Sequence, residues 1–236
     1  YEKTFSPFIL FSKKRYIGNK YEEDTENYKQ TSMGIVLKRR DNADIVKHVY
    51  GTIIDILINK LDLEGSIKFC QEACEKLLRG EYTLDMLIVT KSLRGFYKNP
   101  DQIAHKVLAD RIGEREPGNK PKSNDRIPYV YIETKTSRGA KERQGDKIEH
   151  PSFIRRNKIK TDYKFYITNQ IMKPVEQIFA LILDDIPEFK KKLMKYRKYK
   201  KELQLIDKSL DEDVYDKKID TIRGRYVKDL IFDKYL

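Results

Sequence analysis

The sequence contains no tryptophan, only two cysteines and only three histidines among its 236 residues. Structural zinc sites take four Cys or His ligands, so Cys70 and Cys74 lack two ligands for such a site. The two cysteines lie four residues apart on a predicted helix, where the geometry disfavours a disulfide, and we expect buried thiols. His48, His105 and His150 lie far apart in the sequence, and we expect the first two on helix surfaces.

The sequence also lacks the patterns of a complete active site. It has no glycine-rich phosphate loop, nucleophile elbow or zinc-protease motif. The adjacent carboxylates Asp184 and Asp185 close a predicted helix, and we expect them to face solvent rather than a metal. There is no apolar run long enough to span a bilayer and no signal-like segment, which favours a soluble, intracellular protein.

Positive charge is in excess, with 49 Lys+Arg against 37 Asp+Glu and a formal net charge of +12. A polyanion is therefore the expected partner, nucleic acid before an anionic membrane surface. The basic residues occur in several short clusters, which could follow a nucleic-acid backbone if they lined one groove. Ordinary solvated lysines are the competing interpretation, and it is the one we favour for Lys190–Lys201.

One basic cluster, Lys13-Lys14-Arg15-Tyr16, directly follows the apolar run Phe5–Phe11. On a strand, Lys13 and Arg15 would share one face, and Lys14 and Tyr16 the other. A cation beside an aromatic hydroxyl suits a phosphate or a groove edge. A solvated edge strand whose lysines block aggregation explains the same residues, so the pattern alone leaves both interpretations open.

The spacing of apolar residues predicts a small sheet followed by a mostly helical region and a charged tail. Expected strands cover residues 5–11, 14–21 and 34–39, with a loop at 22–32 and an edge or bulge at Pro7. From residue 41 the period becomes helical. Expected later elements are helices near 42–60, 64–79, 99–112 and 161–185, a strand or link at 85–90, a strand at 126–133, and loops at 117–125 and 134–144. The chain does not begin with Met, and we expect a piece of a larger protein.

Six segments, taken in order, resemble the palm end and thumb of family B DNA polymerases. They are Tyr1–Tyr16, Gly34–Asn42, Leu87–Leu93, His105–Arg111, Asp125–Val130 and Thr168–Pro174. The resemblance covers about residues 1–185 and is nearest to the delta type and to polymerases of large DNA viruses. Cellular delta-type enzymes carry a Cys-rich module after the thumb, whereas residues 186–236 contain no Cys, which favours a viral source.

The resemblance implies an α+β fold in which the end of an antiparallel palm sheet precedes a mostly helical thumb. The implied domains are the C-terminal part of the palm at 1–41, the thumb at 42–185 and a basic C-terminal extension at 186–236. The implied activity is DNA-directed DNA polymerisation, with Mg²⁺ held mainly by aspartates upstream of this segment. No catalytic residue is expected here, Glu2 is the one candidate near the metal site, and the segment alone should be inactive.

The resemblance also implies which residues contact DNA. Lys13, Lys14, Arg15 and Tyr16 would hold the primer near its 3′ end. Thumb candidates for the duplex grip are Arg39, Arg40, Lys91, Arg94, Arg126 and Tyr129. Implied partners are primer–template DNA, deoxynucleoside triphosphates through the full enzyme and a possible sliding clamp, with no membrane. The expected location is the host nucleus or a cytoplasmic viral replication site.

Two other functions remain open from the sequence. The first is a self-contained, non-catalytic nucleic-acid-binding domain, including one for RNA. The second is a structural assembly protein that uses the basic tail.

Overall fold

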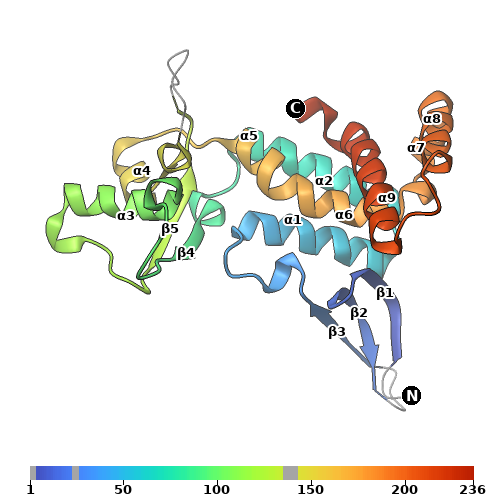
Figure 1. Ribbon diagram of the computed structural model, residues 1–236, viewed down its shortest axis with the longest axis horizontal. Helices are drawn as coiled ribbons and strands as arrows, with labels where there is room; N and C mark the ends of the chain where they lie inside the picture. Colours follow the sequence, from blue (N-terminus) through green and yellow to red (C-terminus); the bar gives the residue numbers. More distant parts are fainter. Residues whose placement is uncertain (1–3, 23–26, 135–142) are drawn as a thin grey trace. The chain divides into compact units, whose positions relative to one another are not determined.

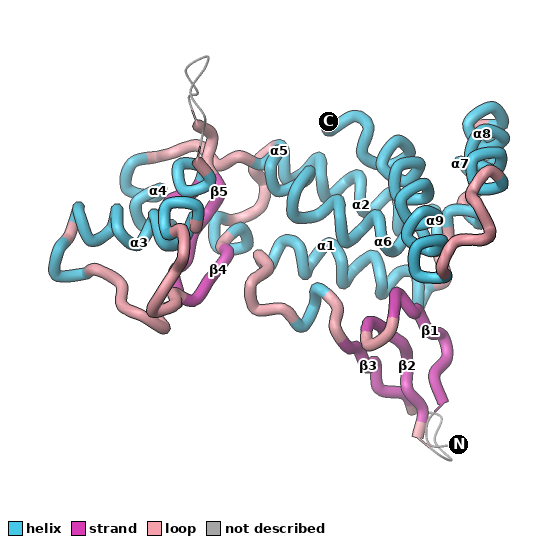
Figure 2. Tube along the Cα trace, viewed as in Figure 1, coloured by secondary structure: helices cyan, strands magenta, loops and turns pink. Residues whose placement is uncertain are grey.

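The computed structural model describes residues 4–22, 27–134 and 143–236, which fold into two compact units (Figure 1). Unit 1 takes the described residues of 4–39, His48–Glu75 and Ile167–Leu236, and unit 2 takes those of Arg40–Lys47 and Lys76–Tyr166. Each unit combines helices with a small sheet, as the tube in Figure 2 shows. The chain is therefore a mixed helix-and-strand protein, as the sequence predicted.

The sheet of unit 1 has three antiparallel strands in the order β1 (Thr4–Ser12), β2 (Arg15–Tyr21) and β3 (Tyr28–Met33). Strand β1 lies at the edge, and its register shifts between Phe5 and Phe8, so the expected bulge at Pro7 is confirmed. The predicted third strand at 34–39 is wrong. Gly34 has a φ of +63°, and Val36–Lys38 form a 3₁₀ turn.

The long helices of unit 1 each bury apolar residues. They are α1 (Asp44–Asp55), its π-helical continuation Ile56–Lys60, α2 (Leu63–Leu78), α6 (Met172–Leu181) and α9 (Glu212–Val227). Helix α6 packs against both β1 and α9, so an early strand and a late helix of the chain contact the same helix in this unit (Figure 1). Val175 and Phe179 on α6 are fully buried. Cys70 and Cys74 on α2 are free thiols with 0% exposure, which confirms their predicted place in the core.

The C-terminal part of unit 1 is folded around an aromatic cluster. Helices α7 (Pro187–Lys191) and α8 (Leu193–Gln204) join α9 there, and the rings of Phe189, Tyr199 and Tyr226 meet with centroids 5.2–5.7 Å apart. Asp184 accepts a hydrogen bond from Tyr199 at 3.0 Å and pairs with Lys200 at 2.6 Å. The prediction that Asp184 faces solvent is therefore wrong, because this carboxylate anchors α8.

The sheet of unit 2 has the antiparallel order β4 (Val89–Ser92), β5 (Arg126–Tyr131) and β6 (Ile148–Glu149). The predicted strand at 126–133 is confirmed, and the strand-or-link segment at 85–90 becomes a 3₁₀ turn leading into β4. Helices α3 (Ala104–Arg115), α4 (Pro151–Asn157) and α5 (Tyr163–Phe165) complete the unit. Helix α3 starts later than predicted, after a 3₁₀ turn at Pro100–Gln102 that Asn99 does not cap with its side chain.

The predicted helix at 161–185 exists but is not continuous. Asp162 caps its start by accepting a hydrogen bond from the Phe165 amide at 2.8 Å. A π-helical segment, Tyr166–Ile171, precedes α6, in which Pro174 is the third residue. Because proline lacks an amide proton, Pro174 explains a local break in the helical hydrogen bonds at this point of the chain.

Two further expectations concern the surface. His48 is exposed, as predicted, whereas His105 is partly covered, with its Nε2 atom 3.1 Å from the Tyr97 hydroxyl. Most of the predicted loop at 134–144 lies outside the described residues. No helix in the described ranges combines the length and the apolar character that crossing a membrane requires.

Candidate nucleic-acid interface

Lys13 and Lys14 form the turn between β1 and β2. Ser12 pairs with Arg15 across the hairpin, which leaves these two lysines as the connecting residues. Lys14 has a φ of +64°, and both side chains are exposed. The expectation that Lys14 and Tyr16 share a strand face is therefore wrong, because β1 ends at Ser12 and alternation stops there. The turn instead presents two adjacent ammonium groups to solvent.

Arg15 and Tyr16 follow the turn and are held by neighbours within unit 1. The Arg15 guanidinium donates a hydrogen bond from Nη2 to Oε1 of Gln177 at 2.7 Å. The Tyr16 ring lies 5.9 Å from that of Phe5 and 5.6 Å from that of Phe8. Packed rings and a bonded guanidinium fix the base of the turn, while the lysines at its tip stay free to meet a ligand.

Arg15 also borders a groove of about 760 Å³ between the β1–β2 turn, α6 and α9. Its charged lining is mostly cationic. The cations are Arg15, Lys173, Lys217, Arg225 and Lys228, and the carboxylates are Glu176 and Asp220. The groove extends the positive surface of the turn along unit 1, which suits an extended polyanion better than a small neutral ligand.

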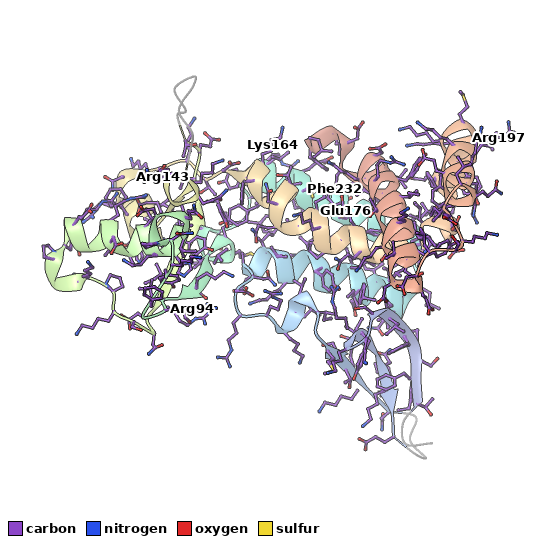
Figure 3. The ribbon with its side chains drawn as sticks, in the orientation of Figure 1. Arg94, Arg143, Lys164, Glu176, Arg197 and Phe232 are labelled. Atoms are coloured by element: carbon purple, nitrogen blue, oxygen red, sulfur yellow. The ribbon has the colours of Figure 1, made fainter. Side chains whose placement is uncertain are left out.

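Glu176 is a half-buried carboxylate in this groove, and Figure 3 labels it on α6. Burial raises the pKa of its carboxyl, and the attraction of Lys228 and Lys173 only partly offsets that rise. Because the pKa of Glu176 is higher in the folded state than in the unfolded state, its contribution to the free energy of unfolding is most favourable below the ordinary pKa range of Glu. That contribution is lost as pH rises through the folded-state pKa. The charged carboxylate thus destabilises unit 1 at neutral pH.

We therefore expect Glu176→Gln to stabilise unit 1 at pH 7 by about 0.5 kcal/mol. The gain should be smaller at pH 4, where Glu176 is largely protonated in both states and resembles Gln. Urea unfolding of both proteins at several pH values measures this difference. A Glu188→Gln control, at an exposed position, should show no such pH-dependent gain. A gain that is equal at pH 4 and pH 7 would contradict the assigned cause.

Unit 2 brings together three of the predicted thumb contacts, Arg40, Lys91 and Arg126. The Nη2 atom of Arg126 donates to Thr90 Oγ1 at 2.6 Å and to the Arg40 carbonyl at 3.5 Å. Lys91 pairs with Asp41 at 2.7 Å. These contacts join residues up to 86 positions apart. The register pairs Arg126 with Ser92 and Lys91 with Ile127, so the two cationic side chains leave opposite faces of the β4–β5 pair.

The other predicted contacts have different settings. Arg94 is exposed just after β4, where its amide donates to the Tyr97 hydroxyl at 2.8 Å, and Figure 3 labels it. Arg39 is exposed and belongs to unit 1. Tyr129 is only 4% exposed, and burial raises the pKa of its hydroxyl, so its ring supports β5 from inside.

No set of carboxylates, histidines or cysteines in the described residues is arranged to hold a metal ion. Glu2, the one candidate near a metal, lies outside the described residues. The described residues therefore offer no ligand set for a magnesium ion.

Comparison with known proteins gives consistent matches. The model of the family described as "DNA polymerase family B" matches residues 1–182. The DNA polymerase of Pyramimonas orientalis virus is 52% identical over 236 residues, which is 100% of this chain and 19% of that protein. The DNA polymerase of Acanthamoeba polyphaga mimivirus is 48% identical over 193 residues, covering 80% of this chain and 11% of that protein.

More distant matches extend the comparison to cellular and archaeal proteins. The DNA polymerase delta catalytic subunit of Caenorhabditis elegans is 34% identical over 189 residues, covering 80% of this chain and 17% of that protein. A solved family B DNA polymerase of Pyrobaculum calidifontis superposes with a TM-score of 0.55 at 18% identity, covering 72% of this chain and 21% of that chain. The chain thus spans about a fifth or less of the length of these proteins, and the archaeal match shows similarity of fold alone.

Proposed function

Because the chain belongs to the family B DNA polymerases, we propose that it is the segment of a DNA-directed DNA polymerase that grips the primer–template duplex. The observation that carries the proposal is the β1–β2 turn, where Lys13 and Lys14 are exposed above an anchored Arg15 and Tyr16. In this proposal the turn holds the primer strand near its 3′ end.

The proposed division of the chain is the end of the palm at residues 1–41, the thumb at 42–185 and a basic extension at 186–236. In unit 2 the proposed duplex contacts are Arg40, Lys91, Arg94 and Arg126, and Arg39 adds one from unit 1. Tyr129, being buried, would act by supporting β5.

The catalytic Mg²⁺ ions, the nucleotide site and any exonuclease would belong to other parts of the polymerase, and a sliding clamp remains a proposed partner. The two viral relatives support a source in a large DNA virus that replicates in the host nucleus or cytoplasm.

Cations that fix a DNA backbone can govern the rate without touching the reacting atoms. Phosphoryl transfer depends on positioning and on charge stabilisation. A displacement of about 1 Å at the reacting end costs roughly a hundredfold in rate. Contacts to phosphates carry no sequence information, which suits an enzyme that must hold any sequence.

The test is duplex binding by the 236-residue chain, measured by fluorescence anisotropy between 50 and 200 mM salt. We expect little sequence preference and a steep loss of affinity with salt, because each neutralised phosphate releases counterions. Lys13→Gln/Lys14→Gln should make the slope of log affinity against log salt shallower by about 2. The control Lys60→Gln/Lys68→Gln removes equal charge from exposed positions of unit 1 and should change the slope little.

A preference for single-stranded RNA, or for one DNA sequence, would favour the self-contained binding domain instead. An unchanged slope in Lys13→Gln/Lys14→Gln would remove the turn from the primer-contact assignment. The chain incubated with magnesium, nucleotides and primer–template should not extend the primer, and synthesis would reveal catalytic residues within this segment.

A further inference from the structure

The basic run after residue 187 folds into an ordered cationic surface on α7 and α8, which we call the basic face. Its members are Lys190, Lys191, Lys192, Lys195, Arg197, Lys198 and Lys201, all exposed. None of them has a carboxylate partner among the described residues, in contrast to Lys200, which pairs with Asp184. The family model ends at residue 182, so the basic face lies beyond the residues that the model matches.

The basic face is held on a rigid base. On α8, Tyr196 and Tyr199 turn inward, and Tyr199 is 0% exposed with its hydroxyl bonded to Asp184. Glu202 accepts hydrogen bonds from Tyr226 and Arg225 on α9, which tie the end of α8 down. The inward face of α8 is thus packed against the rest of unit 1, and Figure 3 shows Arg197 projecting outward from the helix.

Like charges three and four residues apart on a helix repel one another. On α8, Lys198 lies three residues from Lys195 and three from Lys201, and Arg197 lies four from Lys201. A solubilising tail needs no such fixed array, whereas a bound polyanion removes the repulsion. The 12 residues of α8 span about 18 Å, the length of duplex that carries about five phosphates per strand.

We infer that the basic face is a second DNA-backbone contact, separate from the β1–β2 turn. A membrane surface fits less well, because interfacial helices insert an apolar face and the apolar face of α8 is already buried. The large apolar side chains left exposed on α8 lie at its two ends, Leu193 and Met194 at the start and Leu205 at the C-cap, and so form no continuous apolar face. Lysines act as point charges on phosphates, so the contact reads no sequence.

The test compares Arg197→Gln/Lys198→Gln/Lys201→Gln with the parent chain, using random-sequence duplex and anisotropy from 50 to 200 mM salt. We expect about tenfold weaker binding at 50 mM salt and a log–log slope that is shallower by about 2–3. The matched control, Lys60→Gln/Lys68→Gln/Lys76→Gln, removes three exposed charges on and beside α2 and should retain the parent slope. Circular dichroism should show equal helix content, since glutamine is tolerated at exposed helix positions.

Parent affinity and slope in the Arg197/Lys198/Lys201 variant would overturn the inference. The inference would also be overturned if this variant kept its duplex binding but lost binding to phosphatidylserine vesicles or to polyglutamate. Either result would identify a membrane or an acidic protein as the partner of the basic face. The inference and the proposed function fail separately. Loss of duplex affinity only in Lys13→Gln/Lys14→Gln keeps the primer contact and removes the basic face, and loss only in the α8 variant does the reverse.

Discussion

Replacement of Gly34 with alanine is expected to lower the free energy of unfolding of unit 1 by about 3 kcal/mol. Gly34 has a φ of +63°, a conformation that costs an L-residue with a side chain about 1–2 kcal/mol. A Cβ atom at this position would lie 2.4 Å from the carbonyl oxygen of Lys14. Because that atom belongs to backbone, the chain itself must move to accommodate the methyl group.

The displaced carbonyl belongs to the β1–β2 turn, so Gly34→Ala should also disturb the exposed lysines of the proposed primer contact. We expect duplex affinity to fall towards that of Lys13→Gln/Lys14→Gln. Urea unfolding followed by circular dichroism measures the stability loss, and anisotropy measures the DNA affinity. The sequence placed Gly34 inside a strand, whereas its position behind the turn emerges only from the tertiary fold.

Gly224→Ala is the matched control for this substitution. Gly224 lies inside α9, its φ is not positive, and no heavy atom outside its own helix backbone lies within 4 Å of the place that an alanine methyl group would take. Alanine is favoured over glycine in a helix by about 0.5–1 kcal/mol, so this substitution should stabilise the protein. Equal destabilisation by both substitutions would show that the contact behind Lys14 is not the cause.

Secondary structure could be predicted from the sequence wherever it depends on residues that are neighbours in the chain. The second helix was predicted to end near residue 79, and α2 does end at Leu78, just before Gly80, whose φ is +70°. The amide of Gly80 bonds the Leu77 carbonyl and the amide of Glu81 bonds the Lys76 carbonyl, both at 3.0 Å. These bonds give donors to carbonyl groups that the end of the helix leaves without one. Glycine is favoured at this position because it adopts the positive φ that the closure requires.

Strand β3 and the conformation of the β1–β2 turn could not be predicted in the same way. The sequence Tyr28-Lys-Gln-Thr-Ser-Met33 is polar on both faces, and it becomes a strand because β2 offers backbone partners. Lys13 and Lys14 carry none of the residue types that mark tight turns, yet Lys14 adopts a positive φ. Tertiary pairing decided both elements.

The same distinction between local and tertiary determinants applies to the candidate site. The sequence identified the basic residues and, through a family resemblance, their expected role. It did not reveal that Arg126 reaches the Arg40 carbonyl and that Tyr129 is buried behind them, because those contacts join distant segments. Asp184 was missed for the same reason, since Lys200 and Arg223 reach it from helices that follow it in the chain.

Tyr166→Phe is expected to destabilise unit 2 by about 3 kcal/mol. Tyr166 is 0% exposed, and its hydroxyl donates to the Leu87 carbonyl at 2.5 Å and accepts from the Tyr131 amide at 3.1 Å. Phenylalanine fills the same space but leaves two backbone groups without a partner, each worth about 1–3 kcal/mol when buried. Tyr163→Phe is the control, because its hydroxyl has no hydrogen-bond partner among the described residues.

Hydrogen exchange shows where the protein is destabilised. The Tyr131 amide at the end of β5 should exchange faster in Tyr166→Phe than in the parent, and at the parent rate in Tyr163→Phe. Leu87 lies just before β4, so the same hydroxyl links the two strands that carry Lys91 and Arg126. Burial raises the pKa of the Tyr166 hydroxyl, which therefore stays protonated, and the difference in stability should be constant from pH 6 to pH 9. A difference that varies across this range, or an unchanged Tyr131 exchange rate, would mean that the strands are held by other contacts.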